Sequence, residues 1–404
     1  MKRYSKIGLA LLLIGQMILL QACTSNIEDE LRIKTNPDRY EDSSSGPNDP
    51  DPNNPDPSDP STSLPLPNVL AEIAQQNAIP GVQVAHVKGD EVDSYVYGVT
   101  DLNSMTPLTE DHVFQAASVS KAVAAYVFLR LYDKGVYDLD RPLYEYYTYD
   151  RVAKANNPKN NLVTARHVLA HLTGYPNWVT TTHSTAWWDS ALEPGAAYTP
   201  GVDFRYSGEG FTYLQEVLKH LTGKSLQQMA QEEVFGPFDM NSTSFEWLPD
   251  VFAGKNTRGH RVLSGSLTVS DDPMTRWTGR NPNSAFTMIT NAKDFAKFMK
   301  RGVINGEGLK PETYALLTIT ASWPNGVDNP YQSRGLGMVI HKNEKGTSLY
   351  HSGSNSGYLS YFIANLDQDE AVVVFTNSNP AGSAMGRAAF PFFLGGDQTF
   401  HMFN

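Results

Sequence analysis

Two residues at the start of a long apolar segment have the types and the spacing needed for nucleophilic chemistry. Ser118 and Lys121 are three positions apart, so on a helix their side chains share one face. From Val119 to Tyr132 nearly every residue is apolar or alanine, which predicts a helix buried on all sides and ending at Gly135. A buried lysine favours its neutral form, and a neutral amine can take a proton from a neighbouring hydroxyl. The pair therefore predicts an activated serine, whose backbone N–H at the helix start would face a developing oxyanion.

A Ser-x-x-Lys pair also arises by chance, and a solvated lysine in a first helical turn is the alternative, so the motif needs context. The stretch "FRYSGEG" places Tyr206 in the helical middle of the chain, and "YHSGSNSGY" places His351 at the end of a late strand. With these three motifs in this order, the chain resembles the penicillin-recognising serine hydrolases. That group contains class C β-lactamases, D-alanyl-D-alanine carboxypeptidases, D-aminopeptidases and related esterases. Further similar segments, such as "LTEDHVFQAASVSKAV" and "TARHVLAHLTGYPNW", extend the resemblance from about Asn68 to the C-terminus.

The resemblance implies a role for each catalytic residue. Ser118 would be the acylated nucleophile, Lys121 would accept its proton, and Tyr206 would complete the proton relay. Which of Lys121 and Tyr206 is the general base stays open. His351 takes the place of the lysine in the third motif of β-lactamases and would orient the substrate or donate a proton to it. Acylation and hydrolysis would then follow as two steps, with no metal ion or other cofactor.

The resemblance also implies the groups that bind substrate. The backbone N–H groups of Ser118 and Ser354 would form an oxyanion hole, in which each donor lowers the barrier by a few kcal/mol. Gly208, Ser352 and Gly353 would line the substrate site. Gly208 departs from the family pattern, because the second motif usually ends in asparagine, whose amide contacts the acyl-side amide of a peptide or β-lactam.

These residues predict an acyl-enzyme serine hydrolase that acts on small esters or on D-amino-acid peptides and amides. Glycine at position 208 and histidine at position 351 make the alternative of a class C-like β-lactamase less favoured. A different class of function is a non-catalytic lipoprotein that binds cell-wall peptides or penicillin. The presence of Ser118, Lys121 and Tyr206 together argues against a pure binding protein, which has no need of all three.

A metal site is the other chemistry to weigh. His167 and His171 are four positions apart, as a zinc pair on a helix would be. Position 168 is valine, however, and a zinc protease carries its glutamate base there. We therefore expect no metal.

The elements that must position these residues come from both ends of the chain. Alternating apolar residues at 81–87 and 92–99, separated by "KGDE", predict a hairpin. Four further strands are expected near the C-terminus, at 335–341, 348–353, 358–366 and 371–377. Helices and loops occupy the middle, from about residue 109 to residue 300. The fold class expected is α/β (α+β), in which both ends of the domain form one antiparallel sheet, flanked by helices and carrying a mostly helical insertion.

The N-terminal segment predicts an envelope location. Residues 1–22 resemble a lipoprotein signal peptide, and "LQAC" resembles a lipobox, which implies a lipid on Cys23, the single cysteine of the chain. Residues 23–67, rich in proline, aspartate and serine, would form an anchor and extended linker, followed by a hydrolase domain at 68–404. We expect a lipid-anchored protein of the cell envelope, at the outer membrane and facing either the periplasm or the cell surface. A net charge of −11 argues against nucleic acid as a partner, so the expected partners are the membrane and a small-molecule or peptide substrate.

Overall fold

The computed structural model describes residues 63–179, 194–270, 274, 282–323, 331–379 and 381–396. Every described residue belongs to one compact unit of the chain, residues 60–404. The expected signal peptide, Cys23 and nearly all of the linker lie outside the described residues, so the anchoring of the chain stays a prediction. Among the described helices, none is both long enough and apolar enough to cross a bilayer.

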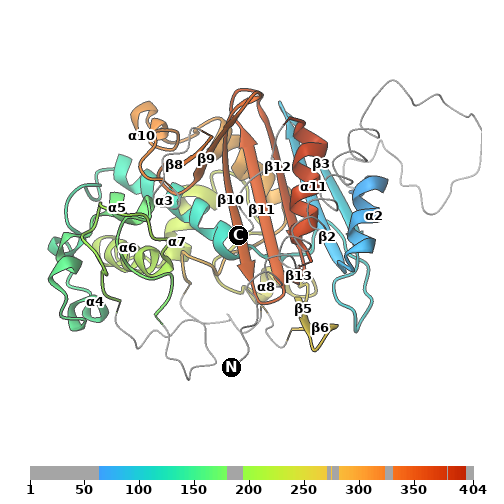
Figure 1. The fold of residues 1–404 in the computed structure, drawn as a ribbon, viewed down its shortest axis with the longest axis horizontal. Coiled ribbons are helices and arrows are strands. Elements are labelled where there is room, and N and C mark those ends of the chain that lie inside the picture. Colours follow the sequence, from blue (N-terminus) through green and yellow to red (C-terminus); the bar gives the residue numbers. More distant parts are fainter. Residues whose placement is uncertain are drawn as a thin grey trace, which may run out of the picture. The chain divides into compact units, whose positions relative to one another are not determined.

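The main sheet joins the two ends of the described chain, as expected (Figure 1). Its eight described strands lie in the order β1 (Leu64–Pro65), β3 (Glu91–Gly98), β2 (Gly81–Lys88), β12 (Glu370–Thr376), β11 (Tyr358–Asn365), β10 (Gly346–Asn355), β9 (Val339–Asn343) and β8 (Gln332–Arg334). All neighbouring pairs are antiparallel except the short pair of β1 with β3, which is parallel. Strand β12 thus joins the N-terminal hairpin to the C-terminal strands.

The expected strand at 335–341 is wrong in its bounds. Instead, β8 ends at Arg334 and β9 begins at Val339, with a tight turn between them. Gly337 takes φ +89° in this turn, and a Cβ there would lie 2.2 Å from the Cβ of Ala125. The sequence "GLGM" therefore forms a glycine turn packed against the buried helix rather than a continuous strand.

The segment between the two halves of the sheet is mostly helical, and it also contributes strands to two small sheets that the sequence did not predict. One small sheet contains β13 (Ser378–Asn379), β5 (His260–Leu263) and β6 (Ser266–Val269), and the other pairs β4 (Phe114–Gln115) with β7 (Ile289–Thr290). The described helices of the unit are α2 (Asn68–Gln76), α3 (Ser120–Asp133), α4 (Asp150–Lys154), α5 (Ala165–Leu169), α6 (Gly208–Thr222), α7 (Leu226–Ala230), α8 (Pro249–Phe252), α9 (Ala292–Lys297), α10 (Pro311–Ala315) and α11 (Ser383–Leu394). Further helical turns of other types are η2 (Ala117–Val119), η3 (Leu143–Glu145), η4 (Pro158–Leu162), η5 (Gln231–Phe235) and η7 (Phe298–Ile304).

The sheet has an apolar layer on each face, because side chains alternate along its strands. In β2, Val84 belongs to the cluster formed with α2 and α11, whereas the next residue, Ala85, belongs to the larger cluster on the other face. Helix α11 contacts both α2 and β12 (Figure 1). The larger cluster contains α3, which is buried along nearly its whole length. The serine and lysine of the first motif therefore lie at the edge of the main core.

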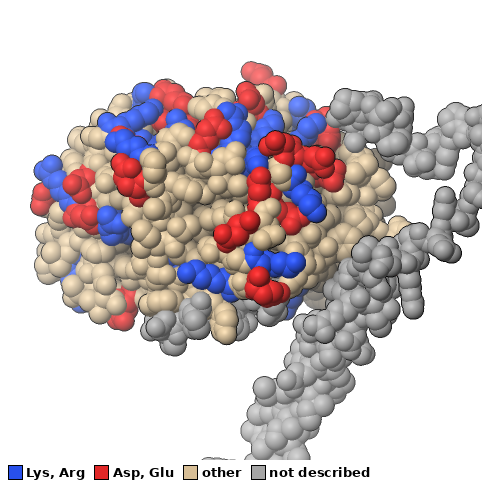
Figure 2. Space-filling view, turned by 90° about the horizontal axis from the view of Figure 1, so that it is seen from above, with Lys and Arg blue, Asp and Glu red and all other residues tan. Residues whose placement is uncertain are grey.

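The surface is mixed in charge on the face drawn in Figure 2. Lysine and arginine side chains alternate there with aspartate and glutamate, and neither sign covers a continuous area. A polyanion such as nucleic acid binds to a concentrated basic surface, which this face does not offer.

Candidate functional site

The serine of the first motif lies in a strained turn. Ser118 is in η2, between β4 and the start of α3 at Ser120. The residue before it, Ala117, takes φ +48°, which is unfavourable for any residue with a Cβ. Backbone strain of this kind persists only where the surrounding packing enforces it, and it is frequent at functional sites.

The lysine of the first motif is fully buried beside this serine, as expected. Lys121 is 0% exposed, and its Nζ donates hydrogen bonds to the Ser118 hydroxyl at 3.2 Å and to the backbone oxygen of Ala285 at 2.9 Å. Burial lowers the pKa of Lys121, and the charge of Arg334 lowers it further, while Tyr206 acts in the opposite direction. No ion pair links Lys121 to a carboxylate of the described residues. The amine thus has both the position and the environment of a proton acceptor.

The structure brings Tyr206 and His351 to the same place. The ring of Tyr206 is centred 4.7 Å from the Nζ of Lys121 and 6.2 Å from the ring of His351. His351 is 3% exposed, its Nδ1 pairs with the backbone oxygen of Ser352 at 2.7 Å, and its Nε2 has no hydrogen-bond partner among the described residues. Burial, with the nearby charges of Arg334 and Lys121, holds the pKa of His351 well below 6.5, so this imidazole is neutral at pH 7.

Strand β10 lies directly against the turn that carries the serine. A Cβ on Gly353 would lie 2.5 Å from the backbone oxygen of Ala116 and 2.8 Å from the backbone nitrogen of Ser118. Ser360, opposite Gly353 on β11, donates a hydrogen bond to the same Ala116 oxygen at 2.6 Å. Only glycine permits this approach, which brings the end of β10, including Ser352 and Ser354, alongside the serine turn. Their substrate-binding and oxyanion roles stay predictions.

Gly208 opens α6, and an indole fills the space that an asparagine side chain would need. A Cβ on Gly208 would lie 2.3 Å from the ring of Trp178. This indole is centred 5.8 Å from the Nζ of Lys121 and packs edge-on against Phe286, with ring centroids 5.5 Å apart. The departure at position 208 therefore replaces an amide by an aromatic wall.

A buried ion pair holds the loop that carries this indole. Arg151 binds Glu209 through both of its terminal nitrogens, at 3.0 Å for Nη2, and the backbone N–H of Val179 donates to the same carboxylate at 2.9 Å. Gly208 and Glu209 both donate backbone hydrogen bonds to the carbonyl oxygen of Asn177 at 3.1 Å. These bonds tie the loop to the start of α6.

The two histidines of the candidate zinc pair lie in different surroundings. Helix α5 ends at Leu169, and His171 takes φ +57° beyond it, so the expectation that both histidines lie on one helix is wrong. The Nδ1 of His167 accepts a hydrogen bond from the backbone of Thr164, which caps the helix. His171 is instead 0% exposed and packs on Tyr206, with ring centroids 4.3 Å apart. Within the described residues, no group of three or more His, Cys, Asp or Glu side chains is placed to hold a metal ion.

Sequence reasoning missed three residues of this site, namely Trp178, His171 and Arg334. Arg334 ends β8, is 7% exposed, and lies with its guanidinium carbon 5.6 Å from the centroid of the Tyr206 ring. The neighbouring residues in "SRGLGM" do not predict this contact, because Arg334 and Tyr206 are 128 residues apart in the sequence. His171 was visible in the sequence only as a possible zinc ligand.

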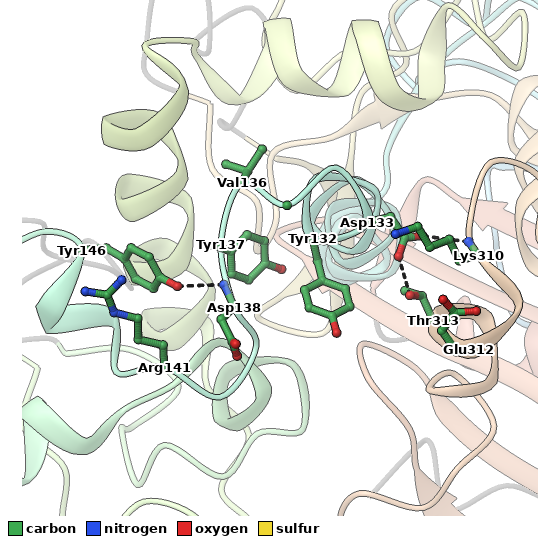
Figure 3. Close-up of a pocket in the computed structure, with 11 residues that line it drawn as sticks. Tyr132, Asp133, Val136, Tyr137, Asp138, Arg141, Tyr146, Lys310, Glu312 and Thr313 are labelled. Carbon is green, nitrogen blue, oxygen red and sulfur yellow. Dashed lines mark hydrogen bonds between the residues drawn. The ribbon is translucent and has the colours of Figure 1, made fainter.

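A separate pocket of about 560 Å³ lies at the other end of α3 (Figure 3). It is lined by aromatic and charged side chains, among them Tyr132, Asp133, Tyr146 and Lys310. Asp133 accepts hydrogen bonds from the Lys310 backbone at 2.7 Å and from Thr313. Since α3 has 14 residues, this pocket is about 20 Å from the serine. None of the motif residues lines it.

Comparison with known proteins agrees with the fold and with the motifs. A family model described as Beta-lactamase matches residues 66–391. The protein named flp from Staphylococcus aureus (strain MW2) is 23% identical over 317 residues, which are 76% of this chain and 61% of that protein. The chain thus spans about three fifths of the length of such curated relatives.

Solved structures resemble the chain at lower identity. The octameric penicillin-binding protein homologue from Pyrococcus abyssi superposes with a TM-score of 0.68 at 19% identity, covering 81% of this chain and 76% of that chain. A beta-lactamase from Sulfitobacter sp. EE-36 gives a TM-score of 0.61 at 18% identity, covering 80% of this chain and 94% of that chain. At such identities the likeness shows the fold alone.

Proposed function

Because the chain belongs to the beta-lactamase family, as its motifs predicted, we propose that it is a serine hydrolase that forms an acyl-enzyme on Ser118. The substrates proposed are small esters or D-amino-acid peptides and amides. One observation carries the proposal: a fully buried lysine amine, without a carboxylate partner among the described residues, lies 3.2 Å from the Ser118 hydroxyl. A purely structural lysine would pair with a carboxylate or reach solvent.

The proposed reaction has two steps. As the Ser118 oxygen attacks the carbonyl carbon, its proton moves to Lys121 or to Tyr206, and the carbonyl oxygen becomes an oxyanion facing the backbone N–H groups of Ser118 and Ser354. Collapse of this intermediate breaks the bond to the leaving group, which takes up a proton from the relay. Water then attacks the acyl-enzyme, releases the acid and restores the serine.

The aromatic wall at position 208 supports esters over amides. The family's asparagine would offer an amide to the acyl-side amide of a peptide or β-lactam, whereas here Trp178 covers Gly208. A site without that donor leaves the substrate's buried amide unpaired, at a cost of about 1–3 kcal/mol. An ester with a simple acyl group has no such amide to satisfy. We therefore place small esters ahead of D-amino-acid peptides, and both ahead of β-lactams.

Covalent labelling tests the nucleophile. The full chain is incubated with a fluorescent fluorophosphonate, and the adduct is located by mass spectrometry. We expect a single adduct on Ser118, because only an activated hydroxyl attacks phosphorus at a useful rate. The S118A variant should remain unlabelled, and the matched control S104A, which alters an exposed serine, should be labelled like the parent.

Kinetics on three substrates then separates the alternatives. Rates are compared for p-nitrophenyl acetate, a D-Ala-D-Ala peptide and nitrocefin. We expect the ester to have the highest kcat/KM. Fastest turnover of nitrocefin would instead indicate a β-lactamase. Absence of both labelling and turnover, with retained binding of a cell-wall peptide, would indicate a non-catalytic binding protein.

A further inference from the structure

The two residues that flank Trp178 are both bonded to the start of α6. The carbonyl oxygen of Asn177 accepts hydrogen bonds from the backbone N–H groups of Gly208 and Glu209, both at 3.1 Å. The side-chain oxygen of Asn177 is a second acceptor for the N–H of Gly208, at 3.0 Å. On the other side, the backbone N–H of Val179 donates to the Glu209 carboxylate at 2.9 Å. The backbone on either side of the indole is therefore fixed to one turn of a helix.

The carboxylate that makes the second of these attachments belongs to a buried ion pair. The side chain of Glu209 is 0% exposed, that of Arg151 is 7% exposed, and both terminal nitrogens of the guanidinium donate to the carboxylate. A buried ion pair is a weak source of stability, because apolar side chains of similar volume often stabilise a protein equally well or better. A carboxylate here does what an apolar side chain cannot do, since it accepts the hydrogen bond from Val179. The pair therefore has a geometric role beside Trp178.

The indole fixed in this way borders the reacting atoms. Its ring is centred 5.8 Å from the Nζ of Lys121, and this nitrogen lies 3.2 Å from the Ser118 hydroxyl. The three indole atoms nearest to a Cβ on Gly208, at 2.3 Å to 2.7 Å, are all carbons of the six-membered ring. Phe286 supports the indole, with ring centroids 5.5 Å apart. An acyl group on Ser118 therefore meets an apolar wall on this side, and the wall is held in place.

We propose that the Arg151–Glu209 pair restricts the site to esters of straight-chain acyl groups, because it fixes Trp178 as a wall beside the acyl position. The inference rests on the proposed acyl-enzyme function and narrows its substrate class. A branch at the carbon next to the carbonyl needs width beside Ser118, and the wall cannot move aside while its backbone is tied to α6. One carbon more or less in a packed pocket changes specificity about 10- to 200-fold. Acyl groups of D-amino acids carry such a branch and are disfavoured for the same reason.

The first test uses the unmodified full chain and two isomeric esters, p-nitrophenyl butyrate and p-nitrophenyl isobutyrate. They have the same atoms and the same leaving group, and only the second is branched next to the carbonyl. The ratio of their kcat/KM values is divided by the ratio of their hydrolysis rates in alkaline buffer, which removes the difference in intrinsic reactivity. We expect this corrected ratio to favour the butyrate about 10- to 200-fold. A corrected ratio that shows no preference would overturn the proposal.

Variants then assign the selectivity to the wall and to its attachment. W178A removes the wall and should abolish most of the corrected preference. R151M/E209M replaces the ion pair by apolar side chains, removes the acceptor for the N–H of Val179, and should lower the preference about tenfold. R151M/E209Q also removes both charges but keeps a side-chain oxygen for that N–H, and it should restore most of the preference. Parental preference in W178A, or equal preference in the two double variants, would contradict the proposal.

A matched control separates this role from general stability. R130M/E233M makes the same exchange at another ion pair, in which the Nε of Arg130 lies 3.2 Å from Glu233 and the glutamate side chain is 3% exposed. This pair lies near the far end of α3, so the control should keep the parental preference even if its Tm falls. Thermal unfolding gives the Tm of every variant. A preference that follows the Tm in all variants, the control included, would mean that Arg151 and Glu209 act only through stability.

Hydrogen exchange separates this proposal from the hydrolase assignment. Mass spectrometry follows the exchange of the peptide that contains Val179, which needs no turnover. Protection of this peptide that is lost in R151M/E209M and kept in R151M/E209Q supports the attachment of the wall, and equal protection in both variants would overturn it. Labelling of Ser118 by the fluorophosphonate with no preference between the two esters would leave the hydrolase in place and remove the selectivity. Absence of labelling would overturn the selectivity together with the hydrolase assignment.

Discussion

At the scale of single residues, burial decides what Lys121 can do. The same side chain on the surface would be a charged, solvated ammonium, whereas here it has 0% exposure and a hydrogen bond to the serine hydroxyl. Desolvation penalises the charged form, and the nearby guanidinium of Arg334 adds to that penalty. The chemistry assigned to the serine therefore depends on the packing around its neighbour.

The pH dependence of labelling tests this protonation state. The pKa of Lys121 is lowered from 10.5, so the neutral amine is present above the lowered value and is lost as the pH falls through it. The rate of fluorophosphonate labelling of the full chain should accordingly rise with pH and level off below pH 10.5. K121R, which stays charged, should react about 10²- to 10⁴-fold more slowly, the range expected for a lost general base.

A profile whose midpoint lies near 10.5, or parental labelling of K121R, would contradict this account. K134R makes the same exchange at a half-exposed lysine beyond the end of α3, and it should keep the parental profile.

At the scale of elements, the site depends on how closely β10 approaches the serine turn. The approach is possible because position 353 lacks a side chain, and the Ser360 hydroxyl on β11 fixes the same turn from the neighbouring strand. Helix α3 and strand β10 are more than 200 residues apart in the sequence. The folding of the sheet brings these two segments together, and neither segment alone predicts the contact.

A methyl group at position 353 should damage activity more than folding. In G353A the new Cβ would lie 2.5 Å from the Ala116 oxygen and 2.8 Å from the Ser118 nitrogen, so β10 or the turn must shift. We expect a loss in labelling rate of about 10²-fold, the effect of a displacement near 1 Å. Stopped-flow labelling and thermal unfolding measure the two effects, and G195A, where the nearest contact is a side-chain amide at 3.3 Å, serves as control. Parental labelling by G353A would contradict the role of this approach.

At the scale of the whole molecule, the two buried histidines of the site should make the folded protein less stable in acid. His171 and His351 are buried, and desolvation with nearby cations holds both pKa values well below 6.5. Below pH 6.5 the unfolded chain takes up protons that the folded protein cannot bind. The folded protein therefore loses no stability to these imidazoles above pH 6.5, loses it as the pH falls from 6.5 towards the lowered folded pKa values, and loses no more below them.

The free energy of unfolding should thus decrease below pH 6.5 by up to about 1.4 kcal/mol per pH unit for each of the two histidines. Urea unfolding of the full chain between pH 4.5 and 7.5 measures the slope, to which carboxylates also contribute. H351N should make the slope shallower, and the control H220N, which replaces an exposed histidine, should leave it unchanged. An unaltered slope in H351N would show that this imidazole is protonated in the folded protein.

Much of the fold followed from patterns along the chain. Alternation predicted the hairpin at 81–87 and 92–99, which forms β2 and β3, and three of the four late strands were placed close to β10, β11 and β12. The fourth was misplaced, because an apolar run with two glycines fits a strand as well as a turn, and only the contact of Gly337 with α3 decides between them. Local pattern also placed the histidine pair on one helix, whereas the chain leaves α5 before His171.

The sequence by itself determined the family, the order of the three motifs and the burial of α3. Each of these depends only on which residue types stand at short, fixed spacings along the chain. It also carries the only argument for a lipid on Cys23, which stays a prediction. The tertiary structure alone decided that Trp178 covers Gly208 and that Arg334 lies against Tyr206 without a carboxylate partner in the described chain. The physical reason is that burial, desolvation and charge balance arise from groups distant in sequence, which only the folded chain brings together.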